Sequence, residues 1–176
     1  MSTQSIIKTL HARIQKLTDK TAFVAPALIR ITVGLVFIGT GWGKLHTLDN
    51  VTEFFTSLHI PLPALNARVA SATEFFGGIL ILIGLGSRLV ALPLSFTMVV
   101  AIITAKLEEV DGVIAFAGLT EWAYLVMFLV IALRGPGALS VDAFLARRFA
   151  ATAADRAGLP KPLLRPNPVT TEATSV

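Results

Sequence analysis

The chain has 176 residues, of which 54% are hydrophobic and only 15% are charged, and its net charge is +4. A soluble domain carries about 25% charged residues, so this composition argues against a soluble protein and for one that lies in a bilayer. The sequence contains no cysteine, which excludes disulfides, thiolate metal sites and iron–sulfur clusters. The basic residues flank apolar segments, where anionic lipid explains them better than nucleic acid.

Apolar stretches predict an all-α fold, an integral membrane four-helix bundle with short interfacial amphipathic helices. A membrane span needs about 20 residues, which the first two stretches meet, whereas the other two are near the lower limit. The predicted spans cover residues 25–43, 67–85, 89–105 and 119–133. They belong to one membrane domain over residues 1–150, and residues 151–176 are proline-rich and polar, which is typical of a disordered tail.

The distribution of Lys and Arg predicts the orientation of the chain in its membrane. Basic residues gather before the first span, in the turn between spans two and three, and after the fourth span, whereas the other two loops are neutral or acidic. Both termini and the tail are therefore expected to be cytoplasmic.

Three short amphipathic helices are predicted outside the spans. Apolar residues recur at helical spacing among basic residues over residues 6–17 and again over residues 141–149, as in helices that lie on a membrane surface. In the loop after the first span, Asn50 is followed three residues later by Glu53. This pattern predicts that Asn50 caps the start of a short helix.

Two charged residues lie within predicted spans, Arg30 in the first and Glu74 in the second. A charge at membrane depth costs about 2.5–3.5 kcal/mol, so each needs a partner or water. Counting residues from the span ends at about 1.5 Å each leaves about 8 Å between them, within the reach of an arginine. We therefore predict an intramembrane pair, which either only fixes helix packing or handles a ligand or protons. A third possibility is that the two do not meet.

Glycines accompany both charges. In the first span the residues at helical spacing form one stripe, composed of Arg30, Gly34, Phe37, Gly41 and Lys44. In the second span, Gly77 and Gly78 follow Glu74. The two glycine faces are expected to pack closely against each other, and Gly39-x-x-x-Gly43 offers an overlapping motif.

A second polar cluster is predicted at the outer ends of the spans, composed of Lys44, His46, Lys106 and Glu121. It is explained either by interfacial anchoring with a surface salt bridge or by a pocket for an anionic or quinone-like headgroup. Haem ligation within a bundle needs histidines on facing spans, and the three histidines all lie outside the spans. We predict no metal and no covalent cofactor, and no catalytic residue is identified. Quinone remains a candidate ligand.

The order and spacing of several short motifs resemble those of the DoxX family. The matching motifs are Arg30-x-x-x-Gly34, Gly41-x-x-Lys44, Leu58-His-Ile-Pro61, Glu74-x-x-Gly77-Gly78, Gly84-Leu-x-x-Arg88 and Gly135-Pro136-Gly137-x-x-Ser140-x-Asp142. The resemblance implies a bacterial inner-membrane protein of four helices. It also implies kinship with small subunits of thiosulfate:quinone and quinol-oxidising complexes and with membrane partners of detoxifying redox enzymes.

The preferred hypothesis is an auxiliary or quinone-associated subunit of a membrane redox system, an oxidoreductase subunit by resemblance alone. Its expected partners are the lipid bilayer and a redox protein, and a homo-oligomer is also compatible with the sequence. The alternatives are a small transporter or permeation protein that uses the Arg30–Glu74 pair, and a purely structural membrane protein.

Overall fold

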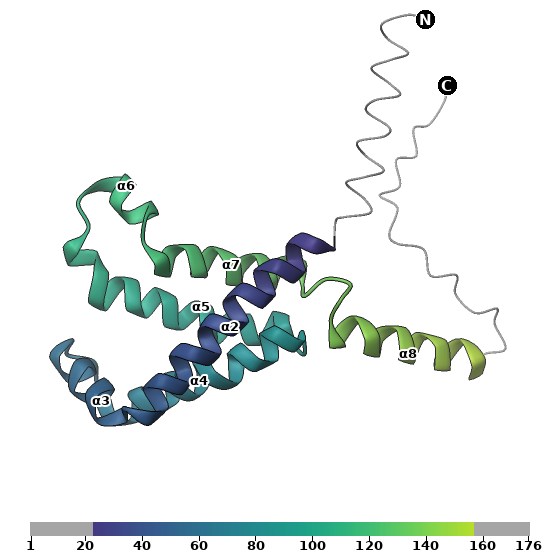
Figure 1. Ribbon diagram of the computed structural model, residues 1–176, viewed down its shortest axis with the longest axis horizontal. Coiled ribbons are helices and arrows are strands. Elements are labelled where there is room, and N and C mark those ends of the chain that lie inside the picture. Colours follow the sequence, from purple (N-terminus) through teal and green to yellow (C-terminus); the bar gives the residue numbers. More distant parts are fainter. Residues whose placement is uncertain (1–22, 157–176) are drawn as a thin grey trace, which may run out of the picture.

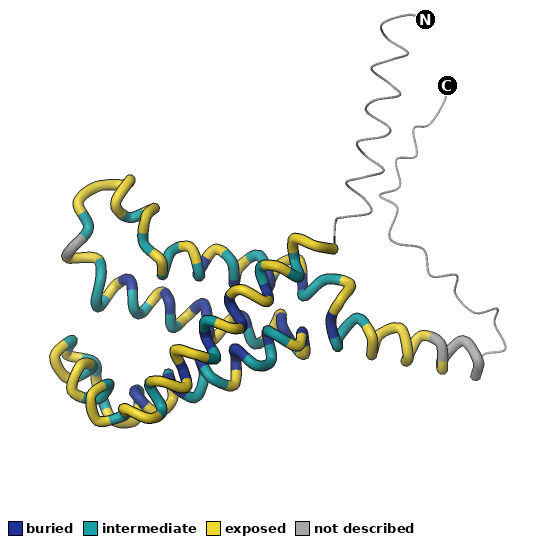
Figure 2. The backbone as a smooth tube through the Cα atoms, viewed as in Figure 1, coloured by how far each residue is buried: buried dark blue, intermediate teal, exposed yellow. Residues whose placement is uncertain are grey.

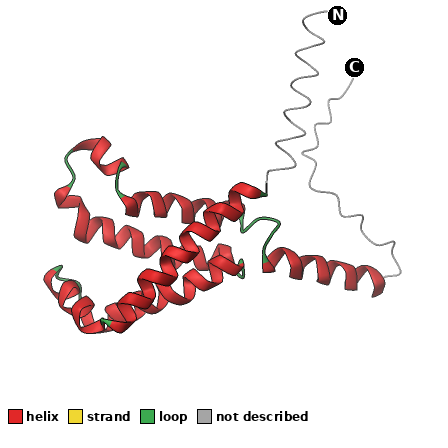
Figure 3. Cartoon of the chain, viewed as in Figure 1, coloured by secondary structure: helices red, strands yellow, loops and turns green. Residues whose placement is uncertain are grey.

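The computed structural model describes residues 23–156, which form helices and no strand (Figure 3). The predicted amphipathic helix at residues 6–17 and most of the predicted tail lie outside the described residues. The last helix, α8 (Val141–Arg156), runs into the segment that the sequence assigned to the tail. Residues 151–156 are therefore helical, and the division of the chain at residue 150 stays a prediction.

Two pairs of helices build the molecule. Helix α2 (Val24–His46) packs along α4 (Pro63–Ile83), and α5 (Ser87–Ala101) packs along α7 (Thr120–Arg134). Figure 1 shows that the two pairs converge near α8 and diverge toward the opposite end, where α3 (Leu48–Ser57) and α6 (Gly112–Ala117) lie. We call the converging side the α8 end and the diverging side the α3 end.

Among the residues that the structure describes, three helices have the length and apolar composition of a membrane span, and they match the first three predicted stretches. They are α2, α4 and the continuous helical stretch Ser87–Lys106. That stretch ends in a π-helical segment, Ile102–Lys106, followed by one 3₁₀ turn, Leu107–Glu109. Helix α7 coincides with the fourth predicted stretch, but its 15 residues are fewer than a span ordinarily needs. The fourth span therefore stays a prediction.

Backbone signals set the ends of α3 and α4. At the end of α4, Gly84 has φ 77°, its N–H donates to the Ile81 carbonyl at 3.1 Å, and the Leu85 N–H donates to the Leu80 carbonyl at 2.9 Å. This is the Schellman arrangement, in which glycine adopts the left-handed conformation at low cost. The short helix predicted after the first span is present as α3, which ends in the same way at His59, with φ 56°.

The predicted cap of α3 is wrong. The helix begins at Leu48 rather than after Asn50, and the residue before it, Thr47, makes no side-chain cap hydrogen bond to its first turn. The Thr47 hydroxyl before it donates to the Gly43 carbonyl at 3.0 Å. Asn50 is the third residue of α3 and therefore lies within its first turn rather than before it.

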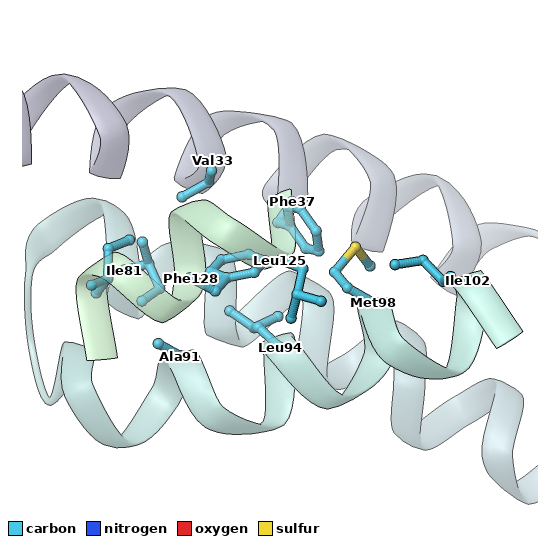
Figure 4. Close-up of a cluster of buried hydrophobic side chains, with 10 residues drawn as sticks. Val33, Phe37, Ile81, Ala91, Leu94, Met98, Ile102, Leu125 and Phe128 are labelled. Carbon is cyan, nitrogen blue, oxygen red and sulfur yellow. The ribbon is translucent and has the colours of Figure 1, made fainter. Parts of the chain in front are cut away.

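The core lies where all four long helices meet (Figure 4), and Phe128 at its centre is fully buried. The Phe37 ring packs edge-on against Phe128 with 4.8 Å between the ring centroids. The other labelled core residues are Val33, Ile81, Ala91, Leu94, Met98, Ile102 and Leu125. Away from this core the helices are mostly exposed (Figure 2), and the exposed side chains include many large apolar ones. An apolar exterior of this extent is expected of a protein in contact with lipid.

Candidate functional site

Arg30 is buried at the α8 end, and backbone carbonyl groups surround its guanidinium. Nε donates to the Leu82 carbonyl at 3.2 Å, Nη1 donates to the Pro136 carbonyl at 2.6 Å, and Nη2 donates to the Leu139 carbonyl. Only 5% of the residue is exposed. The arginine therefore ties α2 to the end of α4 and to the loop after α7. We call this assembly the Arg30 junction.

The predicted C-terminal motif builds the rest of the Arg30 junction. The Asp142 carboxylate accepts hydrogen bonds from the Gly86 N–H at 2.9 Å and the Ser87 N–H at 3.3 Å, and so caps the start of α5. The Ser140 hydroxyl donates to the Gly137 carbonyl at 2.7 Å and accepts from the Ala143 N–H at 3.1 Å, at the start of α8. These bonds give the motif a structural role, because those from Gly86, Ser87 and Ala143 satisfy N–H groups at the starts of α5 and α8.

Gly135 and Gly137 in the same motif both have a positive φ, 84° and 82°. Gly135 also lies so close to Arg88 that a Cβ there would be 2.9 Å from Nε of the guanidinium. Pro136 contributes its carbonyl to Arg30. Glycine at these positions therefore lets the loop adopt its positive φ angles and pass close to Arg88 and Pro26.

The predicted Arg30–Glu74 pair is wrong. Along the α2–α4 contact, Gly34 lies against Leu82, whereas Gly41 lies against Glu74. Arg30 is eleven residues from Gly41 along α2, which places the two charges about 16 Å apart along the helix axis. The prediction failed because it assumed that the ends of α2 and α4 are level, whereas α2 extends past the end of α4 at the α8 end.

Glu74 pairs instead with Lys44, with 2.5 Å between Nζ and Oε1. The carboxylate side chain is 4% exposed and the lysine side chain is 38% exposed. The second carboxylate oxygen, Oε2, is buried and has no hydrogen-bond partner among the described residues. One acceptor of a buried charge is therefore unsatisfied by the protein, which is uncommon and calls for an explanation.

The Lys44–Glu74 pair lines a cavity of about 900 Å³ at the α3 end, between the two diverging helix pairs. Most of its wall is apolar, and Phe37, Phe54 and Phe55 are among its aromatic residues. The polar residues of the wall are Thr40, Lys44, Asn50, His59, Asn66, Thr73, Glu74, Thr97, Thr104, Glu121 and Tyr124. Its volume lies within the range of small-molecule sites, about 300–1,000 Å³, and its apolar wall with a few polar groups is also typical of them.

Only part of the predicted outer cluster belongs to this cavity. Lys44 and Glu121 line it, whereas His46 and Lys106 do not. The His46 Nδ1 atom lies 2.9 Å from the Trp42 carbonyl oxygen of its own helix, and Lys106 is partly exposed at the end of the π-helical segment. Sequence reasoning missed Tyr124, Thr97 and Thr104. The polar character of these residues inside otherwise apolar spans was the available signal.

The predicted glycine faces lie at helix contacts. A Cβ at Gly34 would be 2.8 Å from the Leu82 Cβ, a Cβ at Gly78 would be 2.7 Å from the Ile38 nitrogen, and Gly41 lies closest to the Phe75 nitrogen. Gly77 faces Leu94 of α5. The overlapping motif is not used, because no atom lies within 4 Å of a Cβ built at Gly39 or Gly43.

Among residues 23–156 the structure holds no group of three or more His, Asp or Glu side chains placed to bind a metal ion. The fold and the cavity together define an all-α integral membrane protein with a mainly apolar cavity between two helix pairs. A model of the DoxX family matches residues 25–107, and the chain is 34% identical over 128 residues to "Putative oxidoreductase CatD" of Bacillus subtilis (strain 168). That alignment covers 72% of this chain and 90% of the relative. The chain belongs to the DoxX family, as its motifs predicted.

Two further relatives come from Escherichia coli (strain K12). Inner membrane protein YphA is 32% identical over 120 residues, which cover 65% of this chain and 86% of the relative. Inner membrane protein YqjF is 30% identical over 139 residues, which cover 77% of this chain and all of the relative. No solved structure matches the chain.

Proposed function

We propose that this protein is an inner-membrane subunit of a redox system and that it binds a quinone-class molecule in the cavity at the α3 end. The observation that carries the proposal is the cavity itself, about 900 Å³ in volume, with mainly apolar walls and the Lys44–Glu74 pair on one side. An aromatic headgroup with polar oxygens fits such a wall, because the rings pack on Phe and Tyr while the oxygens meet the charged pair.

The exposed part of the cavity wall supports a ligand that arrives from the lipid phase. Val69 of α4 is 54% exposed and Phe96 of α5 is 68% exposed, and both line the cavity. Each belongs to a helix long and apolar enough to span a membrane. A lipid-soluble quinone would therefore reach the site between α4 and α5 without crossing the aqueous phase.

The oxidoreductase name of the Bacillus subtilis relative supports a redox setting, and the inner-membrane names of the Escherichia coli relatives support the location. In this proposal the chain holds and orients the quinone, and a partner protein exchanges electrons with it. Both termini face the cytoplasm, as the distribution of basic residues predicts. We do not propose permeation, because that hypothesis required an Arg30–Glu74 pair and neither residue contacts the other.

Binding of decylubiquinone tests the proposal. The purified chain in lipid nanodiscs is equilibrated with the quinone, and lipid partition is subtracted with empty nanodiscs. Ala70→Phe should abolish saturable binding, because Ala70 lines the cavity and a phenyl ring would fill it. Ala64→Phe is the matched control, since Ala64 is exposed on the same helix outside the cavity. Equal binding by wild type and Ala70→Phe, or no saturable binding at all, would refute the site.

A pull-down in mild detergent tests the redox setting separately. The proposal predicts that a redox enzyme co-purifies and that deletion of the chain lowers quinone-linked activity in membranes. Recovery of a homomer alone, together with unchanged quinone-linked activity after deletion, would exclude the role of a redox subunit.

A further inference from the structure

We propose that the cavity selects the reduced, hydroxyl-bearing form of its ligand, a quinol, through a hydrogen bond donated to Oε2 of Glu74. This inference rests on the proposed function and adds the redox state that the site recognises. It begins from the two oxygens of the buried carboxylate, which have different surroundings. Oε1 accepts a hydrogen bond from the Lys44 ammonium at 2.5 Å, whereas Oε2 has no partner among the described residues.

A buried carboxylate oxygen of this kind needs a donor. Ionised carboxylates only accept hydrogen bonds, and leaving one unsatisfied in a buried site costs more than an ordinary hydrogen bond gains. Because Glu74 lines the cavity and is 4% exposed, a group inside the cavity is well placed to supply the missing donor. The ligand should therefore carry an O–H or N–H group.

Several other polar side chains of the wall have already used their donors. The Thr97 hydroxyl donates to the Leu94 carbonyl and the Thr104 hydroxyl to the Val100 carbonyl, each at 2.8 Å. The Asn66 amide uses one of its two N–H groups to donate to the Pro61 carbonyl at 2.6 Å. The oxygen atoms of these three side chains still have lone pairs that can accept. The wall therefore offers acceptors on α4 and α5, and a ligand rich in donors complements it.

The two redox states of a quinone differ in this respect. A quinone carbonyl oxygen only accepts hydrogen bonds, so placing it against Oε2 would bring two acceptors together and leave both unpaired. Each quinol hydroxyl can donate as well as accept. The Lys44 ammonium can donate to the oxygens of either form, so it favours neither state. Glu74 is the residue of the wall with a buried and unpartnered acceptor oxygen, so we assign the discrimination between the two states to it.

The test compares decylubiquinol with decylubiquinone on the wild-type chain in nanodiscs under anaerobic conditions. The free ligand is measured by chromatography with electrochemical detection. We expect the quinol to bind at least about tenfold more tightly, the effect of one hydrogen bond to a charged acceptor. If both forms bind equally, or the quinone binds better, the inference fails while the proposed function stands. If neither form binds saturably, the proposed function fails as well.

A glutamine substitution assigns the preference to Glu74. Glutamine in Glu74→Gln has the same shape as glutamate, but its amide adds a donor and removes the charged acceptor. Because the hydrogen bond to a charged acceptor is lost, the affinities for quinol and quinone should come to within about threefold of each other, or the preference should reverse. Glu53→Gln is the control, because Glu53 is exposed on α3 and does not line the cavity, and it should keep the preference. An unchanged preference in Glu74→Gln would overturn the assignment. If this variant does not fold, the wild-type comparison still decides the inference.

Discussion

Lys44 at the end of α2 reaches back to the carboxylate of Glu74 in the middle of α4, with 2.5 Å between Nζ and Oε1. Helical side chains lean toward the N-terminus of their helix, so a lysine near the end of α2 projects back along the helix rather than beyond it. The pair thus neutralises a buried charge with a residue whose backbone lies at the helix end. This pair, rather than one with Arg30, places a buried carboxylate and its counter-charge at the wall of the cavity.

The first prediction concerns this pair. Lys44→Met leaves the Glu74 carboxylate buried without its counter-charge. The variant should destabilise the protein by about 3 kcal/mol, which is the lower end of the cost of breaking a buried ion pair. We take the lower end because the lysine side chain is partly exposed. The double variant Lys44→Met with Glu74→Gln should recover much of the loss. Thermal unfolding in detergent of both single variants and the double variant measures the coupling.

The matched control for that cycle combines Arg30→Met with Glu74→Gln. Because these residues lie about 16 Å apart along the helix axis, their effects on stability should add. Additive losses in the Lys44 cycle, or strong coupling in the Arg30 cycle, would contradict the contacts described above.

The second prediction concerns the Arg30 junction. Arg30→Met removes the donors of three backbone carbonyl groups and should cost at least about 3 kcal/mol, at about 1 kcal/mol or more for each buried acceptor left unpaired. Arg30→Lys should restore less than half of this loss, since one ammonium group cannot reproduce the planar fork of a guanidinium. Urea or thermal unfolding in detergent measures both effects.

Arg88→Lys serves as the control for the junction. Arg88 is exposed and donates one hydrogen bond of 3.3 Å to the Arg134 carbonyl, so the change should have little effect. Similar losses of stability for Arg30→Lys and Arg88→Lys would show that the three carbonyl contacts of Arg30 contribute no more to stability than the single contact of Arg88.

The third prediction separates two glycines of the same helix. Gly41→Ala would drive a methyl group into the backbone of Phe75 and should destabilise the α2–α4 contact by about 1–3 kcal/mol. Gly43→Ala meets no atom within 4 Å, and it should be neutral or stabilise the helix by up to about 1 kcal/mol through propensity. The melting temperatures of the two variants measure both effects. Equal melting temperatures for Gly41→Ala and Gly43→Ala would contradict the register of α2 against α4.

The fourth prediction concerns the cap of α5. Asp142→Ala removes the acceptor of the Gly86 and Ser87 N–H groups and should cost about 0.5–2 kcal/mol, as the loss of a helix cap does. Hydrogen exchange at those two amides should accelerate. Asp49→Ala, in the exposed first turn of α3, is the control and should leave their exchange unchanged. Unaltered protection in Asp142→Ala would show that the cap contributes nothing.

The positions of the long helices were predictable because their signal is local. Hydropathy placed the first stretch at residues 25–43, where α2 covers Val24–His46, and the second at residues 67–85, where α4 covers Pro63–Ile83. Proline at the start of α4 and glycine at its end fix the boundaries through the backbone alone. Gly34, Gly41 and Gly78 also predicted which faces of α2 and α4 meet, whereas Gly77 lies against Leu94 of α5.

The partners of the buried charges were not predictable from the same pattern. How far one helix extends past its neighbour depends on packing, and the stripe of α2 contained both Arg30 and Lys44 without indicating which of them is level with Glu74. The acceptors of Arg30 are backbone carbonyl groups of Leu82, Pro136 and Leu139. Every residue carries such a group, so no side-chain motif identifies them.

The length of α7 has a consequence for the surrounding lipid. Its 15 residues extend about 22 Å, whereas the hydrocarbon layer of a typical bilayer is about 30 Å thick. A membrane that α7 crosses must therefore become thinner beside it, or the apolar α6 segment, with Val113 83% and Ile114 91% exposed, must sink among the acyl chains. Either adjustment makes the protein sensitive to acyl-chain length, so vesicles of short-chain lipids should accept it more readily than vesicles of long-chain lipids.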